Sequence, residues 1–162
     1  MVGPEDNAGA AAQGVAGGGF VSSYLHLLDP KRRLTIPAEW REVVGTPPSL
    51  YVIPGQGGDC CLYVYPAREI MPRLQRLRNV RFADHKARSC QRRLASESNL
   101  VNWDSQGRIR ISDSLLDRAK LTDEVKLIGA FDHFELWNPK EWDAAGAPDD
   151  VSMEDAFKYL DF

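Results

Sequence analysis

Two short segments of the sequence combine turn-forming and basic residues in the same spacing. In each, an aspartate stands four residues before an arginine, first in Asp29-Pro30-Lys31-Arg32-Arg33 and again in Asp104-Ser105-Gln106-Gly107-Arg108. A basic side chain at the tip of a tight turn can reach DNA phosphates, and an arginine there can donate two hydrogen bonds to a guanine edge. The candidate DNA-contacting residues are therefore Lys31, Arg32, Arg33, Arg108 and Arg110, and the candidate turn-forming residues are Asp29, Asp104 and Gly107.

A second interpretation of these segments needs no ligand. Asp29 with Arg33, like Asp104 with Arg108, would then form ion pairs that only stabilise the turns. We favour DNA contact by the basic residues, because two basic turns in one chain can bind neighbouring DNA sites together, and linked contacts raise the affinity. The two aspartates are better turn-formers than DNA readers.

A strongly basic segment separates the two turns. Between residues 68 and 93 the chain carries many arginines against only Glu69 and Asp84, and leucines are interleaved with them. We expect two helices here, with Pro72 in the first turn of one and Asp84 capping the other. A charge run on a helix is usually a solvated face. The sequence therefore leaves two roles open, phosphate contact or structure, for Arg88, Gln91 and Arg92.

The composition predicts a folded protein outside the membrane. The 162 residues are 43% hydrophobic and 27% charged, a mixture typical of soluble globular proteins. No window approaches the about 20 apolar residues that a membrane helix needs, and the N-terminus lacks a signal-peptide pattern. We therefore expect a cytoplasmic protein with no membrane partner. The net charge of -3 alone disfavours nucleic acid, but the basic residues are concentrated in one part of the chain.

No residue pattern indicates an enzyme. The three histidines stand in unrelated contexts, and neither Cys60 nor Cys61 has an activating partner nearby in sequence. The three cysteines form neither a disulfide framework nor a paired metal motif, and no glycine-rich loop is followed by Lys-Ser or Lys-Thr. We expect no catalytic residue, no cofactor, no metal site and no small-molecule substrate. The four tryptophans are expected in the core or in subunit contacts rather than as stacking platforms for bases.

The two basic turns belong to a longer internal repeat. Residues 28–37 align with residues 103–112, and at the same offset residues 50–53 align with residues 125–128. Each copy predicts a strand, a tight turn, a strand, a short helix, two further strands and a helix. The strands predicted most clearly are residues 50–54, 60–65, 100–103, 108–111, 124–130 and 133–138. One copy is too small for a large core, so we expect the two copies to bury their apolar faces on each other.

This repeat divides the chain into five segments. A Gly- and Ala-rich tail, residues 1–19, is predicted to be disordered because it has almost nothing large to bury. The first copy of the repeat occupies residues 23–70, a basic helical linker residues 71–97, and the second copy residues 98–142. Residues 143–162 form an acidic C-terminal segment.

The sequence resembles the MraZ family of bacterial proteins. The similarity rests on both basic turns, on an Arg-x-x-Gln-Arg element at Arg88, Gln91 and Arg92, and on the phrase Leu-Ile-Gly-Ala-Phe-Asp-His-Phe-Glu-Leu-Trp at residues 127–137. It implies two SpoVT/AbrB-type modules with an α+β fold. That fold would be a tandem double-split β-α-β structure, or swapped-hairpin AbrB-like barrel, with a helical linker and a C-terminal helix.

The resemblance also implies a function. Such a chain would be a sequence-specific transcriptional regulator that forms a ring-like homo-oligomer in the cytoplasm, at the nucleoid. It would bind double-stranded DNA at short direct repeats upstream of division and cell-wall genes, without catalysis. Arg32 stands where the family has glycine, so we expect a slightly altered first turn. The alternative function is an oligomeric, antitoxin-like interaction module whose acidic C-terminal segment docks a partner.

Overall fold

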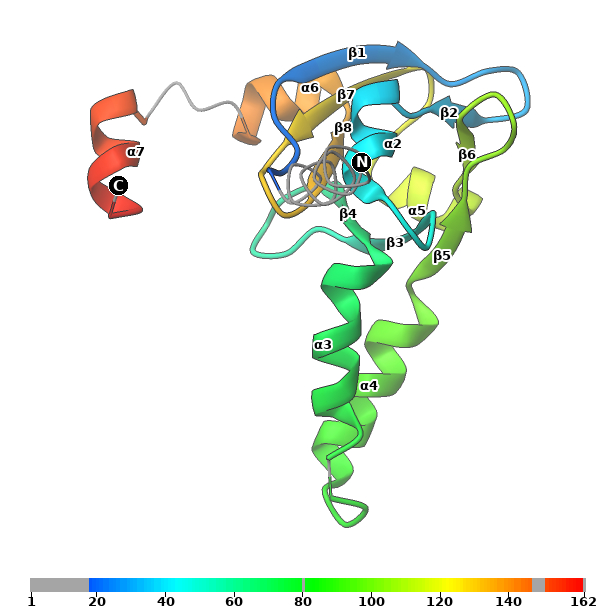
Figure 1. Cartoon of the computed structure of the whole chain (residues 1–162), viewed down its shortest axis with the longest axis vertical. Coiled ribbons are helices and arrows are strands. Elements are labelled where there is room, and N and C mark those ends of the chain that lie inside the picture. The colour runs from blue at the N-terminus through cyan, green and yellow to red at the C-terminus, as the bar shows by residue number, and fades with distance from the viewer. Residues whose placement is uncertain (1–17, 80, 147–150, 162) are drawn as a thin grey trace, which may run out of the picture.

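The two halves of the chain fold into the same succession of strands and helices (Figure 1). The computed structural model describes residues 18–79, 81–146 and 151–161. The first half contains β1 (Ser23–Leu27), β2 (Arg33–Thr35), α2 (Ala38–Val44), β3 (Ser49–Pro54) and β4 (Cys61–Pro66). The second half contains β5 (Asn99–Asn102), β6 (Arg108–Arg110), α5 (Asp113–Arg118), β7 (Glu124–Gly129) and β8 (Phe134–Trp137). The first half is followed by α3 (Ala67–Leu77) and α4 (His85–Ser96), and the second by α6 (Pro139–Glu141), the π-helical turn η1 (Trp142–Gly146) and α7 (Met153–Tyr159).

The strands of the two halves are interleaved. Six antiparallel strands form one sheet in the order β1-β7-β8-β4-β3-β5, and β2 pairs with β6 in a second, two-stranded sheet. The first strand of each half therefore pairs with the third strand of the other half, β1 with β7 and β5 with β3. This exchange joins the two halves into one body, because neither half can complete its sheet alone.

The larger sheet is open, so the predicted closed barrel is wrong. Within the six-stranded sheet, as far as the structure describes the chain, β1 and β5 each have a strand on one side only. After each of these edge strands the chain turns at a basic segment, and the strands that follow, β2 and β6, pair with each other instead of extending the sheet. The result is a mixed α+β structure with an open antiparallel sheet.

A hydrophobic core joins the two sheets and the short helices. Leu34 of β2 and Ile109 of β6 are cross-strand neighbours, and both are 1% exposed. Trp40 of α2 packs against Phe134 of β8, with ring centroids 4.8 Å apart. Trp40 and Trp137 are buried, which confirms the predicted structural role of these two tryptophans. Burial of this core anchors β2 and β6, and with them the basic turns.

The helices α3 and α4 form a hairpin that projects from the sheet (Figure 1). α3 begins at Ala67, directly after β4, so that Pro72 lies inside the helix and the prediction that it occupies the first turn is wrong. Pro66 explains the difference: its φ of -56° suits the residue before a helix, which lets α3 start ahead of Pro72. The predicted cap of α4 is confirmed, because the Asp84 carboxylate accepts a hydrogen bond from the Ala87 N–H at 2.9 Å.

Both ends of the chain are described only in part. The predicted N-terminal tail lies outside the described residues except for Gly18 and Gly19, which lead into Phe20 and its bridge to Phe131. At the other end, residues 147–150, between η1 and α7, also lie outside them, as does Phe162. In the part of the chain that the structure covers, no helix is long and apolar enough to cross a membrane.

Candidate nucleic-acid interface

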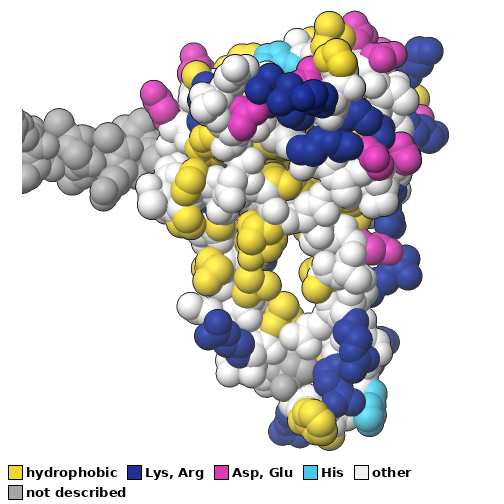
Figure 2. Space-filling view, turned by 90° about the vertical axis from the view of Figure 1, so that its right-hand side faces the viewer, with side chains coloured by type: hydrophobic (Ala, Val, Ile, Leu, Met, Phe, Trp, Pro, Cys, Tyr) yellow, Lys and Arg dark blue, Asp and Glu magenta, His cyan; other side chains and the backbone are white. Residues whose placement is uncertain are grey.

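The two-stranded sheet places basic side chains on one outward face. Arg33 lies opposite Arg110, and Thr35 lies opposite Arg108. The middle residue of each strand is buried in the core, and successive side chains of a strand point to opposite sides. These four residues therefore point outward together, and we call them the β2–β6 face. Figure 2 looks onto this side of the molecule and shows Lys and Arg side chains gathered on it, with Asp and Glu beside them.

Asp29 organises the first basic turn. Its Oδ1 accepts hydrogen bonds from the backbone N–H groups of Lys31 at 2.9 Å and Arg33 at 2.8 Å, and its Oδ2 accepts one from the Arg33 Nε at 2.7 Å. The backbone closes where the Arg32 N–H donates to the Asp29 carbonyl at 2.8 Å. Hydrogen bonds from Arg33, first from its backbone and then from its side chain, hold the pKa of Asp29 below the ordinary value.

Asp104 organises the second basic turn in the same way. Its Oδ1 accepts hydrogen bonds from the backbone N–H groups of Gln106 at 2.9 Å and Arg108 at 3.0 Å, and its Oδ2 accepts one from the Arg108 Nε at 2.9 Å. The Gly107 N–H donates to the Asp104 carbonyl at 2.9 Å. The pKa of Asp104 is lowered by the backbone hydrogen bond from Arg108 and by the other donors of the turn. Both ion pairs of the purely structural interpretation are therefore present.

The two turns share one backbone geometry although one has arginine where the other has glycine. Arg32 has a φ of 58° and Gly107 a φ of 77°, so both lie in the left-handed region. The hydrogen bonds of the first turn match those of the second, and the expected alteration of the first turn is therefore wrong. A non-glycine residue in this region costs about 1 kcal/mol. Contacts of the Arg32 side chain offset part of that cost.

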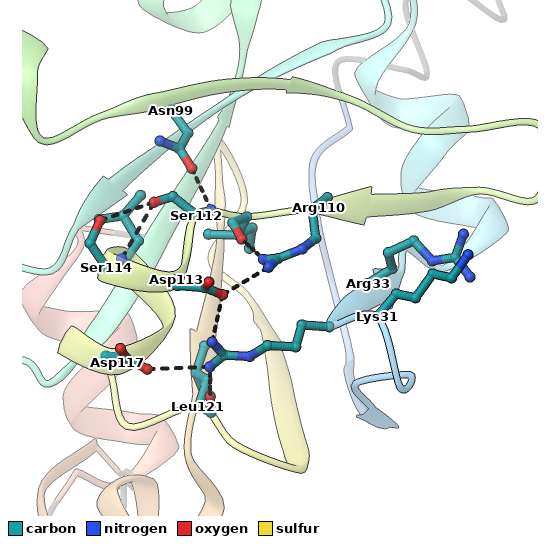
Figure 3. Close-up of polar contacts among 12 residues, drawn as sticks. Lys31, Arg33, Asn99, Arg110, Ser112, Asp113, Ser114, Asp117 and Leu121 are labelled. Carbon is teal, nitrogen blue, oxygen red and sulfur yellow. Dashed lines mark hydrogen bonds and ion pairs between the residues drawn. The ribbon is translucent and has the colours of Figure 1, made fainter.

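The Arg32 side chain is bound by the second half of the chain. Its NH1 donates to Asp113 Oδ1 at 2.5 Å, and its NH2 lies 3.3 Å from both Asp117 Oδ1 and the Leu121 carbonyl. Asp113 also accepts a hydrogen bond from Arg110 NH2 at 2.8 Å (Figure 3). The Arg110 hydrogen bond is the largest cause of the lowered pKa of Asp113, to which Arg32 adds. One carboxylate thus binds an arginine from each half.

Lys31 and Arg33 are directed away from that carboxylate. Figure 3 shows the two side chains extending side by side, on the far side from Asp113. Within the described residues, the Lys31 ammonium has no hydrogen-bond or ion-pair partner, and Arg33 uses only its Nε. Arg108 NH1 lies 3.9 Å from Asp29 Oδ2, too far for a hydrogen bond. The terminal guanidinium nitrogens of Arg33 and Arg108 therefore keep donors for an external acceptor.

A further cation lies at the second turn, and the sequence did not predict it. The Arg41 guanidinium, from α2, covers Gly107: a Cβ on this glycine would stand 2.7 Å from the guanidinium carbon. A side chain at position 107 would therefore be strained by the positive φ and would also require the flexible end of Arg41 to shift. The Arg41 Nε is buried and has no hydrogen-bond partner among the residues described. No sequence signal connects the two residues, because they come from different halves of the repeat.

The candidate residues of the linker lie on α4, in the projecting hairpin rather than at the turns (Figure 1). The Arg88 guanidinium lies 4.7 Å from the centre of the Phe82 ring, and its NH2 is 2.5 Å from His85 Nδ1. Gln91 lines an apolar groove between α3, α4 and the sheet. Arg92 is exposed. Arg88 therefore makes local contacts within the hairpin, and Arg92 is exposed to solvent.

A polar cluster lies on the outer face of the larger sheet, away from the turns. His133 Nδ1 lies 2.8 Å from Asp132 Oδ1, its Nε2 lies 3.0 Å from Glu135 Oε2, and its ring stacks on Tyr65 with centroids 4.7 Å apart. Burial lowers the pKa of His133, but its hydrogen bonds to Glu135 and Asp132 outweigh burial and raise it. No group of three or more His, Cys, Asp or Glu side chains is placed to hold a metal ion in the described part of the chain.

Comparison with known proteins gives one consistent family. A family model described as "MraZ protein, putative antitoxin-like" matches residues 94–158. The transcriptional regulator MraZ of Clostridium acetobutylicum is 34% identical over 123 residues, 76% of this chain and 84% of that protein. The protein of the same name in Corynebacterium jeikeium is 39% identical over 123 residues, 76% and 83% of the two chains, and that of Desulforamulus reducens is 34% identical over 135 residues, 83% and 92%. The chain therefore belongs to the MraZ family.

Proposed function

We propose that this protein is a DNA-binding transcriptional regulator and that the β2–β6 face, with its two flanking turns, contacts DNA. The observation that carries the proposal is the convergence of Arg33, Arg108 and Arg110 on one outward face beside Lys31. A structural role alone does not require three arginines on the exposed side of two three-residue strands. Relatives that are 34% and 39% identical to it over 123 residues are named transcriptional regulators, which supports the same conclusion.

The chemistry of the proposed contact follows from how the two aspartates bind their arginines. Asp29 and Asp104 each accept a hydrogen bond from the Nε of an arginine, so the guanidinium is held in one orientation. The terminal nitrogens of Arg33 and Arg108 then donate to guanine edges or to phosphates, and the fixed orientation lowers the entropy lost on binding. Lys31 acts as a point charge toward a phosphate.

Other candidates take different roles in this proposal. Arg32 is not assigned a DNA contact, because its guanidinium is engaged by Asp113 and Asp117. Arg110 stands at the edge of the contact surface, where it shares Asp113 with Arg32. Arg92 remains a candidate phosphate contact, whereas Arg88 and Gln91 serve the packing of the hairpin.

The resemblance to the family and the exchanged strands support a wider proposal. The chain is a tandem double-split β-α-β structure whose modules are residues 23–70 and 98–142. It assembles as a ring-like homo-oligomer in the cytoplasm, at the nucleoid, and occupies short direct repeats in promoters of division and cell-wall genes without catalysing a reaction. A ring that presents many weak contacts binds repeated DNA tightly, because later contacts form within one complex.

The test is a binding titration of the full chain against fluorescent duplex DNA from upstream of its own gene and against scrambled DNA of equal length. Wild-type protein should prefer the native DNA, and its affinity should fall steeply with salt because counterions are released. Arg33→Ala combined with Arg108→Ala should abolish the preference. It should also reduce the salt slope by about one for each phosphate that the variant no longer binds.

The matched control is Arg93→Ala, which removes an arginine of α4 whose side chain is 74% exposed. This variant should bind almost as wild type. Sedimentation of all variants checks that they still assemble. Equal binding by wild type and the double variant would refute the contact surface. No preference for native DNA in the wild type would instead favour the interaction-module alternative.

A further inference from the structure

An apolar groove lies between α3, α4 and the outer side of the sheet. It has a volume of about 380 Å³ and is lined by Tyr51 and Ile53 of β3, Leu100 of β5, Ile70 and Leu74 of α3, and Leu94 of α4. Leu94 is 48% exposed and Leu100 is 58% exposed. Figure 2 shows the hollow, with hydrophobic side chains along it and Lys and Arg side chains on the projecting helices. Leaving these leucines in water is unfavourable, so a covering partner would stabilise the groove.

The C-terminal helix α7 carries a matching apolar stripe. Met153, Ala156, Phe157 and Leu160 follow the i, i+3, i+4, i+7 spacing of one helix face. Met153 is 73% exposed, Phe157 52% and Leu160 61%. An isolated helix shorter than about 12 residues is only marginally stable in water. This helix has seven residues, so burial of the exposed part of the stripe on another surface would stabilise it.

The charges of the two surfaces are complementary. α3 and α4 contain Arg and Lys with a single carboxylate, that of Glu69. The first turn of α7 carries Glu154 and Asp155, next to the apolar stripe. Opposite charges on the rims of two apolar surfaces steer their association and fix its orientation. The chain thus carries both an apolar groove between two basic helices and a helix with an apolar stripe and acidic residues in its first turn.

Within one chain, α3 separates α7 from the groove. α7 follows η1, whose Trp142 packs against Trp137 of β8 with ring centroids 5.4 Å apart. The groove lies on the other side of α3, where Ile70 and Leu74 point into it, while Arg73 on the opposite side reaches Tyr65. Figure 1 shows α7 standing apart from both α3 and α4. A groove on a neighbouring chain meets no such barrier.

We propose that the groove between α3, α4 and the sheet receives helix α7 of a second copy of this chain. The inference rests on the homo-oligomer of the proposed function and names the surfaces that join its subunits. It does not depend on DNA binding. Met153, Phe157 and Leu160 enter the groove, and Glu154 and Asp155 face the basic helices at its rim.

The test places a photoreactive p-benzoylphenylalanine at Phe157 of the full chain. After irradiation, a denaturing gel should show a covalent dimer, and peptide mapping should place the cross-link in residues 67–77 or 91–100. The matched control carries the same group at Lys158, whose ammonium is 2.8 Å from Glu154, off the apolar stripe. It should give much less dimer. A cross-linked monomer, a dimer mapped elsewhere or no cross-link above this control would each overturn the proposal.

A second variant guards against a misleading result from the bulky probe. Leu94→Asp, at a half-exposed position, should keep the fold but reduce the cross-linked dimer at least about tenfold, because a charge replaces a leucine that the helix buries. An unchanged yield would also overturn the proposal. Binding of native DNA by the same samples separates the two proposals. Cross-linking without DNA selectivity contradicts only the regulator, and DNA selectivity without cross-linking contradicts only the groove.

Discussion

Arg33 and Arg110 are direct cross-strand neighbours in the two-stranded sheet. Like charges placed opposite each other destabilise a strand pair. Each of these arginines is compensated by its own carboxylate, Arg33 by Asp29 at 2.7 Å and Arg110 by Asp113 at 2.8 Å. The carboxylates lie at the border of the face and allow it to keep its cations. The repulsion between the two arginines is therefore offset within the protein, and the face keeps donors for the proposed DNA contact.

Asp29→Asn should reduce DNA selectivity without removing an arginine. The asparagine Oδ1 still accepts the two backbone hydrogen bonds of the turn, but the charged partner of Arg33 Nε is removed. Arg33 then samples more orientations, so preference for native over scrambled DNA should fall several-fold. Affinity for scrambled DNA should rise, since one negative charge leaves the surface. Fluorescence anisotropy with both DNAs checks this, and Asp104→Asn provides the matched variant in the second turn. Unchanged selectivity in both would show that the aspartates do not orient the arginines.

The fold should lose stability in acid through the turn aspartates. The pKa values of Asp29 and Asp104 are lowered in the folded chain, mainly by backbone hydrogen bonds from Arg33 and Arg108. A lowered folded pKa gives stabilisation that is present above the ordinary value of 3.8 and is lost as the pH falls through the folded pKa. Urea midpoints measured from neutral pH down to about pH 3 should therefore fall at the acid end. The Asp29→Asn, Asp104→Asn double variant should show a flatter decline of the urea midpoint with falling pH. An equal decline would show that the two aspartates are not the cause of the acid sensitivity.

Arg32→Gly should leave both stability and DNA binding nearly unchanged. Glycine removes about 1 kcal/mol of strain at positive φ, but it also removes the contacts with Asp113, Asp117 and the Leu121 carbonyl, whose contribution is of a similar small size. The free energy of unfolding should change by less than about 1 kcal/mol. Arg32→Ala keeps the strain without the ion pairs, so it should be less stable than Arg32→Gly. Urea unfolding gives the free energy of unfolding of both variants. A loss of DNA selectivity in Arg32→Gly as large as in Arg33→Ala would make Arg32 a contact residue.

Gly107→Ala should be more harmful than Arg32→Gly. Alanine at a φ of 77° costs about 1 kcal/mol, and its Cβ would collide with the Arg41 guanidinium. The Arg41 guanidinium must then shift away from the second turn, which removes a cation beside the proposed contact surface and lowers affinity for native DNA. Thermal unfolding and anisotropy together check this. Arg41→Ala, Gly107→Ala should recover part of the stability, because the collision is removed. Equal stability of the single and double variants would show that strain alone accounts for the loss.

Local patterns predicted most of the strands. The expected strand at residues 50–54 differs by one residue from β3, Ser49–Pro54, and the one at residues 124–130 by one residue from β7, Glu124–Gly129. Alternating β-branched and apolar residues bounded by turns define such segments from nearby sequence alone. The closed barrel was wrong because closure depends on which distant strands pair, and no local pattern specifies that β2 pairs with β6. The start of α3 was missed because Pro72 is also tolerated inside that helix.

The candidate site was predictable in its residues but not in their orientations. The aspartate and arginine of each turn are four residues apart, so their spacing alone suggested the ion pairs that the structure contains. The partner of Arg32 is Asp113, 81 residues away, and the contact of Arg41 with Gly107 also crosses between the halves. Only the folded arrangement shows that Arg32 is engaged while Lys31 and Arg33 extend outward.

The His133 cluster should make stability depend on pH above neutrality. The pKa of His133 is raised by Glu135 and Asp132 despite burial, so the protonated ring is favoured in the folded chain. A raised folded pKa gives stabilisation that is complete below the unfolded value of 6.5 and is lost as the pH rises through the folded pKa. Urea midpoints should therefore fall as the pH rises above 6.5. In His133→Gln the side chain still hydrogen-bonds but does not titrate, so this fall should disappear. Proton NMR of the His133 ring gives its pKa directly, and a value at or below 6.5 would show that burial outweighs the two carboxylates.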